Sequence, residues 1–426
     1  MSAGFPLSTI GTRIGGGGTS IELLMHDLGE ALGSGRDTIL MLGGGNPAAI
    51  PKVIEVWRRR MQELLDDEGA TFSRMLGDYD PPRGSPAFLE AMAGLLRREF
   101  GWEVTPDNLA VTAGGQTAFF LLFNLLAGDM PDGSRRKVLL PMAPEYIGYC
   151  DLGLTMPLFE AKRPRIEHTG PHRFKYRVDF DSLDISPDVA LVCASRPTNP
   201  TGNVMTDDEV RRLAKRCREA GVPLVLDNAY GTPFPQIIFR EATPYWDDNT
   251  ILTLSLSKLG LPGTRTAVVV APPEIARSIQ AMTSITGLAN NNVGQAIITP
   301  LLESGEIIRL SREVIQPFYK KKAAHALKVA AATLPDNIDY HLHESEGALF
   351  LWLWLRGLPI SSREFYERLK ARGVLVLPGE FFFYGVGEED WPHSRECLRI
   401  SFSMDRETVE RGFEIIADEA AKAFGR

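Results

Sequence analysis

Short, continuous apolar runs alternate with helical patterns between about residue 50 and residue 270. An apolar run without polar alternation is typical of a strand buried on both faces, and strands separated by helices are typical of a parallel sheet. We therefore predict an α/β fold in which a mostly parallel sheet lies between helices. The predicted strands are Leu109–Thr112, Lys137–Leu140, Ala190–Ala194, Pro223–Leu226, Ile251–Leu254 and Thr266–Val270. The predicted helices are Ile54–Asp66, Pro86–Phe100, Ala118–Ala127, Glu145–Gly153 and Asp207–Ala220.

The pattern changes after residue 308, where a long helical stretch, Arg309–Leu334, precedes strands and helices in a different order. This order predicts a smaller α+β domain over residues 309–426, beside a large domain over residues 51–308. Its predicted strands are Leu349–Leu355, Val374–Leu377 and Leu398–Phe402, and its helices are Ser362–Arg372 and Thr408–Phe424.

Residues 1–50 are expected to form an N-terminal arm and a helix. The first 18 residues are polar and rich in glycine, which favours a mobile arm. Apolar residues then recur at helical spacing over Ile21–Leu32, and this amphipathic helix is expected to pack on the small domain.

Composition excludes several classes of partner. The net charge of −8 gives no basic field that would attract nucleic acid or anionic lipid. The longest apolar run, Ala348–Leu355, is far shorter than the about 20 residues of a membrane span. The four cysteines have no metal-ligand spacing, so we expect reduced thiols, a cytoplasmic protein and no metal site.

Polar clusters follow five successive apolar segments of the predicted sheet. Because ligands of parallel sheets collect beyond the carboxyl ends of the strands, these clusters predict one binding crevice. The clusters are Gly114–Thr117, Pro144–Tyr146, Pro197–Asn203, Asp227–Tyr230 and Ser255–Lys258.

Lys258 stands at the end of a buried strand among small side chains, in the segment ILTLSLSKLGLPGTR. Loss of solvation would lower its pKa, so that the neutral amine can condense with an aldehyde. Taken alone, the pattern also fits a solvated lysine at a strand end. The strand, glycine turn and helix start around Gly114–Gln116 would add an anion cradle, and Arg265 a fixed cation. A third glycine is missing, so a phosphate fits this cradle better than a dinucleotide.

Four segments resemble the class I and II aminotransferases, which have pyridoxal phosphate (PLP) fold type I. They are SRPTNPTGN (Ser195–Asn203), DNAYGTPF (Asp227–Phe234), SLSKLGLPGTR (Ser255–Arg265) and CLRISFS (Cys397–Ser403). The resemblance implies PLP as cofactor and a large domain with a mostly parallel seven-stranded sheet between helices, plus a smaller α+β domain. LGGGNP (Leu42–Pro47) and APEYIGYCD (Ala143–Asp151) resemble more narrowly the branch that exchanges amino groups between valine and pyruvate.

The resemblance also implies roles around the cofactor ring. Lys258 would bind PLP covalently and then move protons, and Asp227 would keep the pyridine nitrogen protonated. Tyr230 and Asn199 would hydrogen-bond the phenolic oxygen of the ring. Tyr146 would stack on the ring face.

The remaining roles concern the phosphate and the substrate. The phosphate would be bound by Gly114, Gly115, Gln116, Ser255, Ser257 and Arg265. Tyr79 would reach it from a neighbouring subunit, which implies a homodimer with shared active sites. Arg399 would bind the substrate carboxylate, assisted by Asn199 and by the backbone near Gly44 or Gly45.

The side chain of the substrate is expected to be neutral. Ser278–Ile308, where relatives that act on aspartate carry a second arginine, contains no lysine or arginine. The resemblance therefore favours transamination of L-valine with pyruvate. An aminotransferase for aspartate, aromatic or broad substrates, or a PLP-dependent C–S lyase, remains the alternative. The segment around residues 381–398 is expected either to line the pocket or to form a surface loop.

Overall fold

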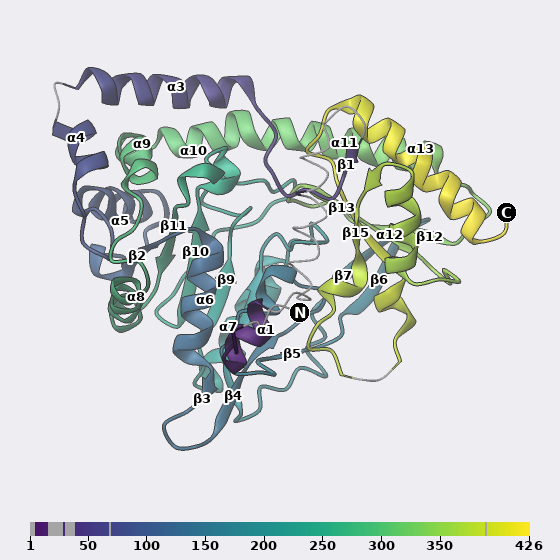
Figure 1. Ribbon diagram of the computed structural model, residues 1–426, viewed down its shortest axis with the longest axis horizontal. Coiled ribbons are helices and arrows are strands. Elements are labelled where there is room, and N and C mark those ends of the chain that lie inside the picture. The colour runs from purple at the N-terminus through teal and green to yellow at the C-terminus, as the bar shows by residue number, and fades with distance from the viewer. Residues whose placement is uncertain (1–4, 16–28, 30–38, 68–69, 388–389) are drawn as a thin grey trace.

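The computed structural model describes residues 5–15, 29, 39–67, 70–387 and 390–426 (Figure 1). Its central feature is a large mixed sheet with the strand order β2-β11-β10-β9-β8-β4-β3, in which β5 also pairs with β4. The strands are β2 (Leu109–Thr112), β3 (Gly128–Asp129), β4 (Arg135–Leu140), β5 (Phe159–Ala161), β8 (Val189–Ser195), β9 (Leu224–Asp227), β10 (Thr250–Ser255) and β11 (Ala267–Val270).

The predicted fold class is confirmed, with eight strands where seven were expected. Strands β10, β9, β8, β4 and β5 run parallel to one another. Strands β11 and β2 are antiparallel at one edge, and the two-residue β3 is antiparallel at β4. Every residue of β2, β8, β9, β10 and β11 is buried, which is why these strands have continuous apolar sequences.

Helices lie on both faces of this sheet and along one end of it (Figure 1). Helix α6 packs against β2, β10 and β11, and α8 packs against β2. The helices of this part of the chain are α3 (Pro51–Asp66), α4 (Ala70–Gly77), α5 (Pro86–Phe100), α6 (Gly115–Leu126), α7 (Asp207–Glu219), α8 (Pro273–Thr286) and α9 (Asn292–Glu303).

A second sheet has the order β15-β16-β13-β12-β7-β6. Its strands are β6 (Arg165–Gly170), β7 (Arg173–Arg177), β12 (Tyr340–His343), β13 (Phe350–Leu355), β15 (Leu377–Pro378) and β16 (Cys397–Ser401). The hairpin β6–β7 comes from the middle of the chain, yet β7 pairs in parallel with β12. The division of the chain into two domains at residue 309 stays a prediction. Hairpin β6–β7 precedes that position in the sequence but pairs with a strand that follows it.

The predicted long helix is divided into three helical segments: α10 (Glu306–Leu310), a π-helical turn over Ser311–Ile315, and α11 (Gln316–Thr333). Helix α11 packs on α13 (Arg406–Ala423), which in turn packs on α12 (Ser362–Ala371). These helices lie along the second sheet in Figure 1. No helix in the described part of the chain combines the length and apolar character needed to cross a membrane.

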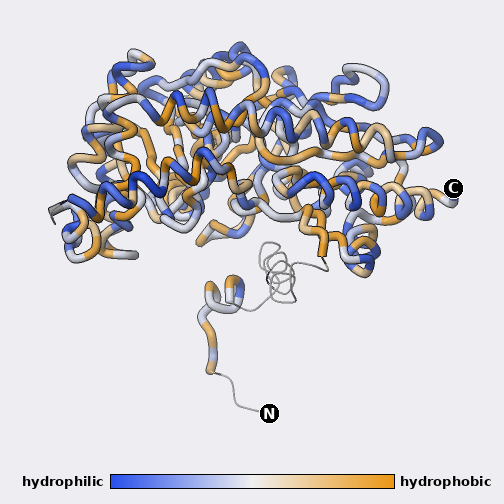
Figure 2. Tube along the Cα trace, turned by 90° about the horizontal axis from the view of Figure 1, so that it is seen from above, coloured by the Kyte–Doolittle hydropathy of each residue, from blue (hydrophilic) through white to orange (hydrophobic). Residues whose placement is uncertain are grey.

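The N-terminal region is described in part. Residues Thr9–Gly15 form the short helix α1 within the expected arm, and Figure 2 shows it beside the body of the molecule. Strand β1 (Leu40–Met41) pairs in parallel with β14 (Val374–Leu375), so this segment contacts the C-terminal part of the chain. The helix predicted over Ile21–Leu32 lies outside the described residues.

The helix predicted over Glu145–Gly153 was wrong. Only Ile147–Tyr149 forms a single 3-10 turn, η2. The backbone N–H of Glu145 donates to the carbonyl of Phe382 at 3.0 Å, and the Tyr384 hydroxyl donates to the carbonyl of Tyr146 at 2.9 Å. These tertiary hydrogen bonds hold the loop in a non-helical form.

Candidate active site

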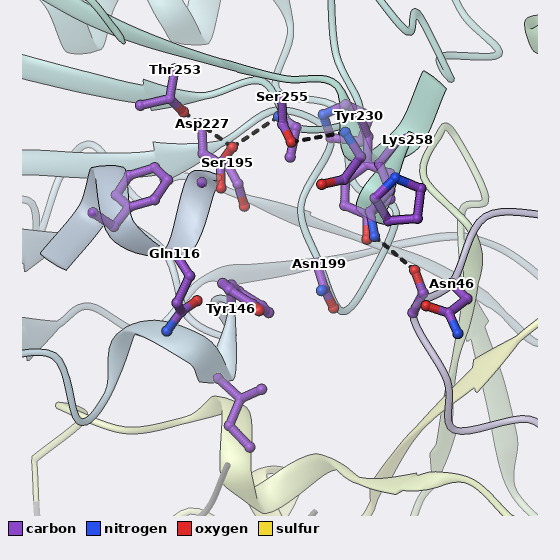
Figure 3. A pocket seen from close by; sticks show the side chains of 18 of the residues that line it. Asn46, Gln116, Tyr146, Ser195, Asn199, Asp227, Tyr230, Thr253, Ser255 and Lys258 are labelled. Carbon is purple, nitrogen blue, oxygen red and sulfur yellow. Dashed lines mark hydrogen bonds between the residues drawn. The ribbon is translucent and has the colours of Figure 1, made fainter. Parts of the chain in front are cut away.

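A cavity of ≈ 450 Å³ lies at the carboxyl ends of β8, β9 and β10 (Figure 3). Ser195, Asp227 and Ser255 are the last residues of these three strands, and all line it. Arg399 on β16 closes the cavity from the second sheet. The predicted residues found in the lining are Gly44, Gly45, Gly115, Gln116, Tyr146, Asn199, Asp227, Tyr230, Ser255, Ser257, Lys258, Arg265 and Arg399.

Asp227 presents a carboxylate that is held from three directions. Its Oδ2 accepts the hydroxyl of Tyr149 at 2.5 Å. Its Oδ1 accepts the N–H of Ala229 at 2.8 Å and the hydroxyl of Thr253 at 3.3 Å. Burial raises the pKa of Asp227, whereas these donors and the charge of Lys258 act in the opposite direction. The arrangement fixes one carboxylate in a dry site, suited to a protonated ring nitrogen.

Lys258 lies in the 3-10 turn η3 (Ser257–Leu259) directly after β10. Its Nζ donates to the carbonyl of Gly45 at 2.7 Å and lies 5.3 Å from the ring centroid of Tyr230. Burial, together with the positive charges of Arg399 and Arg265, lowers its pKa to about 8, while Asp227 acts in the opposite direction. A substantial fraction of this amine is therefore neutral near pH 8, as attack on an aldehyde requires.

Arg399 is a buried cation, 4% exposed, that forms no ion pair among the described residues. Its Nη1 donates to Asn199 Oδ1 at 2.8 Å and its Nη2 to the carbonyl of Gly43 at 2.6 Å, while its Nε has no partner. The guanidinium carbon lies 4.0 Å from the ring centroid of Phe350. Burial lowers its pKa to about 10. Because an unpaired buried charge is costly, binding of an anionic ligand beside Arg399 would be favourable.

A second anion site lies where α6 begins. Gly115 and Gln116 open the helix, and the guanidinium of Arg265 lies against its N-cap, Gly114. Gly114 has φ 87°, a backbone conformation that residues with a Cβ rarely adopt, and a Cβ there would displace the guanidinium of Arg265. Arg265 itself has φ 45°, a strained conformation for an arginine. Free helix amides and a fixed cation are suited to a phosphate.

Two predicted residues lie outside the lining of this cavity. Gly114 sits behind it as the N-cap of α6. Tyr79 lies on the loop between α4 and α5 with 84% of its surface exposed. Its proposed contact with a phosphate therefore depends on a second subunit.

Sequence reasoning missed two residues behind the cavity. Tyr149 bonds to Asp227, and Glu145 bonds to Ser195 and to the backbone of Tyr146. Both lie in the segment already singled out around Tyr146, and a buried carboxylate at position 227 requires donors from somewhere. That requirement was the only signal available for Tyr149, and it did not indicate which segment would supply the donor.

The segment around residues 381–398 contacts the loop beside the cavity, and none of its described residues lines the cavity. Phe382 and Tyr384 bond to the backbone of Glu145 and Tyr146. Farther along, Trp391 packs against Phe383, with ring centroids 5.2 Å apart. The segment thus attaches the second sheet to the loop that carries Tyr146.

The donor set fits PLP. The amine of Lys258, with its lowered pKa, would receive the aldehyde, the fixed carboxylate of Asp227 the ring nitrogen, and the start of α6 with Arg265 the phosphate. The unpaired Nε of buried Arg399 leaves a donor for the carboxylate of a second molecule.

Comparisons with known proteins agree with this geometry. Residues 158–416 match the family described as aminotransferase class I and II. The chain is 45% identical to the valine–pyruvate aminotransferase of Escherichia coli (strain K12) over 95% of this chain and 96% of that protein. A solved valine–pyruvate aminotransferase from Salmonella typhimurium LT2 has a TM-score of 0.87 and 42% identity, covering 96% of this chain and 100% of that one. A putative amino-acid aminotransferase from Psychrobacter arcticum 273-4 has a TM-score of 0.96 and 40% identity, covering 99% and 100%. The chain belongs to the class I and II aminotransferases, enzymes that depend on PLP.

Proposed function

We propose that this enzyme transfers an amino group from L-valine to pyruvate and forms 3-methyl-2-oxobutanoate and L-alanine. The observation that carries the proposal is the distribution of cations in the cavity. Lys258 and Arg265 are assigned to the cofactor, so only Arg399 remains for substrate among the described lining residues. One arginine matches an amino acid with a single carboxylate. The name of the Escherichia coli relative points to the same pair of substrates.

When bound, PLP supplies the electron sink that stabilises negative charge at the amino acid Cα. Lys258 would hold the aldehyde of PLP, and its amine would serve as the general base and acid that moves the Cα proton. Asp227 keeps the ring nitrogen protonated, since its carboxylate is fixed by Tyr149 and by the N–H of Ala229. Tyr230 lies beside Lys258, with its ring centroid 5.3 Å from Lys258 Nζ.

The substrate carboxylate is assigned to Arg399 and Asn199, which already form one unit through their hydrogen bond of 2.8 Å. Gly43 holds the other side of the guanidinium through its carbonyl. Fixing the carboxylate and the amino group at two points orients the Cα–H bond toward Lys258.

The substrate side chain meets a neutral wall. Met41 and Ile147 line the cavity, and Asn46 lies at its edge near Lys258 (Figure 3). A second carboxylate, as in aspartate, would be desolvated there without a partner, which costs binding energy. A branched aliphatic side chain has no such cost.

A homodimer completes this proposal. Four large apolar side chains are exposed near the loop of Tyr79: Leu76 (63%), Tyr79 (84%), Ile285 (86%) and Leu288 (65%). The segments that carry them are joined, because Asn292 Nδ2 donates to the carbonyl of Asp78 at 3.1 Å. Such a patch favours burial against a second copy, whose phosphate site Tyr79 would reach. The four cysteines are free and three are buried, which supports a reducing, cytoplasmic location.

The lowered pKa of Lys258 predicts how PLP uptake depends on pH. Attack on the aldehyde needs the neutral amine, and with a pKa of about 8 that fraction rises about tenfold between pH 7 and pH 9 and then levels off. We expect the uptake rate of PLP-free protein, followed by visible absorbance, to show this curve. N-acetyl-lysine methyl ester is the control, with a rise of about 100-fold over the same range. A protein curve that matches the control would refute the assignment.

Substrate choice is tested by steady-state kinetics with pyruvate as acceptor. We expect kcat/KM for L-valine to exceed that for L-aspartate by about 10- to 100-fold, the factor that follows from one unpaired buried charge. Stoichiometric alanine without ammonia is the expected product. Ammonia release would support lyase chemistry instead, and faster turnover of aspartate would contradict the valine assignment.

The dimer is tested by sedimentation and by PLP titration. Tyr79→Phe should leave the dimer intact and weaken PLP binding about 3- to 10-fold, because one hydrogen bond to a charged group is lost. Leu76→Asp should produce monomers with weak PLP binding. Leu154→Asp, 46% exposed at the opposite edge of the sheet, is the matched control and should remain dimeric. A wild-type monomer that binds PLP fully would contradict the shared site.

A further inference from the structure

Glu145 is a buried carboxylate for which the reaction described above has no use. It follows β4, directly precedes Tyr146, and is 3% exposed. It lies behind the cavity and does not line it. Among the described residues it has no cationic partner. Burial raises its pKa to about 7, while hydrogen bonds from Ser195 and from the N–H of Tyr146 act in the opposite direction. A buried acid without a counter-charge is costly, so its retention needs a reason.

Three donors converge on this carboxylate. Oε1 accepts the N–H of Tyr146 at 2.9 Å and the hydroxyl of Ser195, and Oε2 accepts the N–H of Ser195 at 3.0 Å. Only an acceptor with two equivalent oxygens satisfies two backbone N–H groups and a hydroxyl in this way. The carboxylate thus ties the loop of Tyr146 to the end of β8.

Both residues held by Glu145 line the cavity. Tyr146 presents its ring to the cavity, and Ser195 is the register partner of Asp227 in the neighbouring strand (Figure 3). The N–H of Arg196 also donates to the carbonyl of Asp227 at 2.9 Å. A shift of Glu145 would therefore move the aromatic wall and the strand end beside the ring carboxylate.

The backbone of the same loop reaches the arginine on the second sheet. The N–H of Glu145 donates to the carbonyl of Phe382 at 3.0 Å, and the Phe382 ring centroid lies 5.5 Å from the guanidinium carbon of Arg399. Phe382 is fully buried and belongs to the 3-10 turn η6 (Gly379–Phe382), which follows β15, the strand that pairs with β16 beside Arg399. Tyr384 adds its hydrogen bond to the carbonyl of Tyr146.

We propose that the Glu145 carboxylate is a positioning group that sets the aromatic wall of the cofactor site and the adjoining end of β8, within a loop whose backbone is bonded to Phe382 beside Arg399. This inference rests on PLP binding in this cavity, and it is independent of the choice of valine as substrate. Glu145 touches neither reactant. Its carboxylate acts through Tyr146 and Ser195.

The test is Glu145→Gln, which keeps the size of the side chain but replaces one acceptor oxygen with a donor. We expect apparent PLP affinity to fall at least about 3-fold, the visible circular dichroism of bound PLP to change, and kcat/KM to fall about 10- to 100-fold, since small misplacements are costly in catalysis. The matched control is Glu209→Gln, a glutamate 8% exposed that accepts hydrogen bonds from Thr206 at the start of α7 and lies outside the cavity lining. It should behave as wild type in all three measurements.

Two further variants keep the test decisive if Glu145→Gln fails to fold. Ser195→Ala removes one donor to Glu145, and Tyr384→Phe removes one bond to the loop of Tyr146. Each should reproduce the change in circular dichroism and PLP affinity in weaker form. Wild-type PLP affinity, dichroism and kcat/KM in the folded variants, with only a lower melting temperature, would overturn the proposal. Failure of the valine assignment would show instead as an inactive wild type whose variants still differ in dichroism.

Discussion

The site depends on keeping charged groups dry at the ends of parallel strands. Asp227, Lys258 and Arg399 line one cavity. Burial favours the neutral form of each group, because it raises the pKa of Asp227 and lowers the pKa of Lys258 and of Arg399. Removing such charges from water costs several kcal/mol for each ion, roughly, unless partners are fixed around it. The structure supplies those partners from the backbone and from neutral side chains, so the charges stay available to ligands. The reactivity of these groups toward ligands follows from two features: they are shielded from water, and fixed polar groups hold them in place.

The fold explains how these groups meet. Parallel strands β8, β9 and β10 end at one edge, which brings Ser195, Asp227 and Ser255 together, and Lys258 follows β10 after a short turn. Arg399 comes from the antiparallel second sheet, and its bonds to Asn199 and Gly43 join three distant parts of the chain. This contact fixes the position of Arg399 relative to the ends of the parallel strands.

The sequence predicted the parts of the site that local pattern determines. Continuous apolar runs indicated the buried strands, and the polar residues at their ends indicated the cavity, including Asp227 and Lys258. The resemblance to aminotransferases supplied roles that pattern alone left open, such as that of Arg399. The family and the fold class are confirmed, whereas the roles of the individual residues stay predictions.

Other features depend on tertiary contacts that no local pattern encodes. Residues 145–153 were predicted to be helical, but a hydrogen bond to the carbonyl of Phe382 and another from the hydroxyl of Tyr384 hold that loop in a non-helical form. Hairpin β6–β7 joins the second sheet because β7 pairs with Leu342 and His343, which lie roughly 170 residues later in the chain. Tyr149 was missed because a buried carboxylate at position 227 requires a hydrogen-bond donor but does not indicate which residue supplies it. Glu145 was missed because its bonds to Ser195 form only when β8 and the loop of Tyr146 come together in the fold.

One spectroscopic measurement tests the central claim directly. The purified protein with PLP should show a visible absorbance band that L-valine bleaches and pyruvate restores, because the proposal assigns both half-reactions to the same lysine and the same arginine. A band that valine leaves unchanged and aspartate bleaches would keep the mechanism and refute the substrate. The absence of any band with added PLP would contradict the assignment of Lys258 and with it the account of the site.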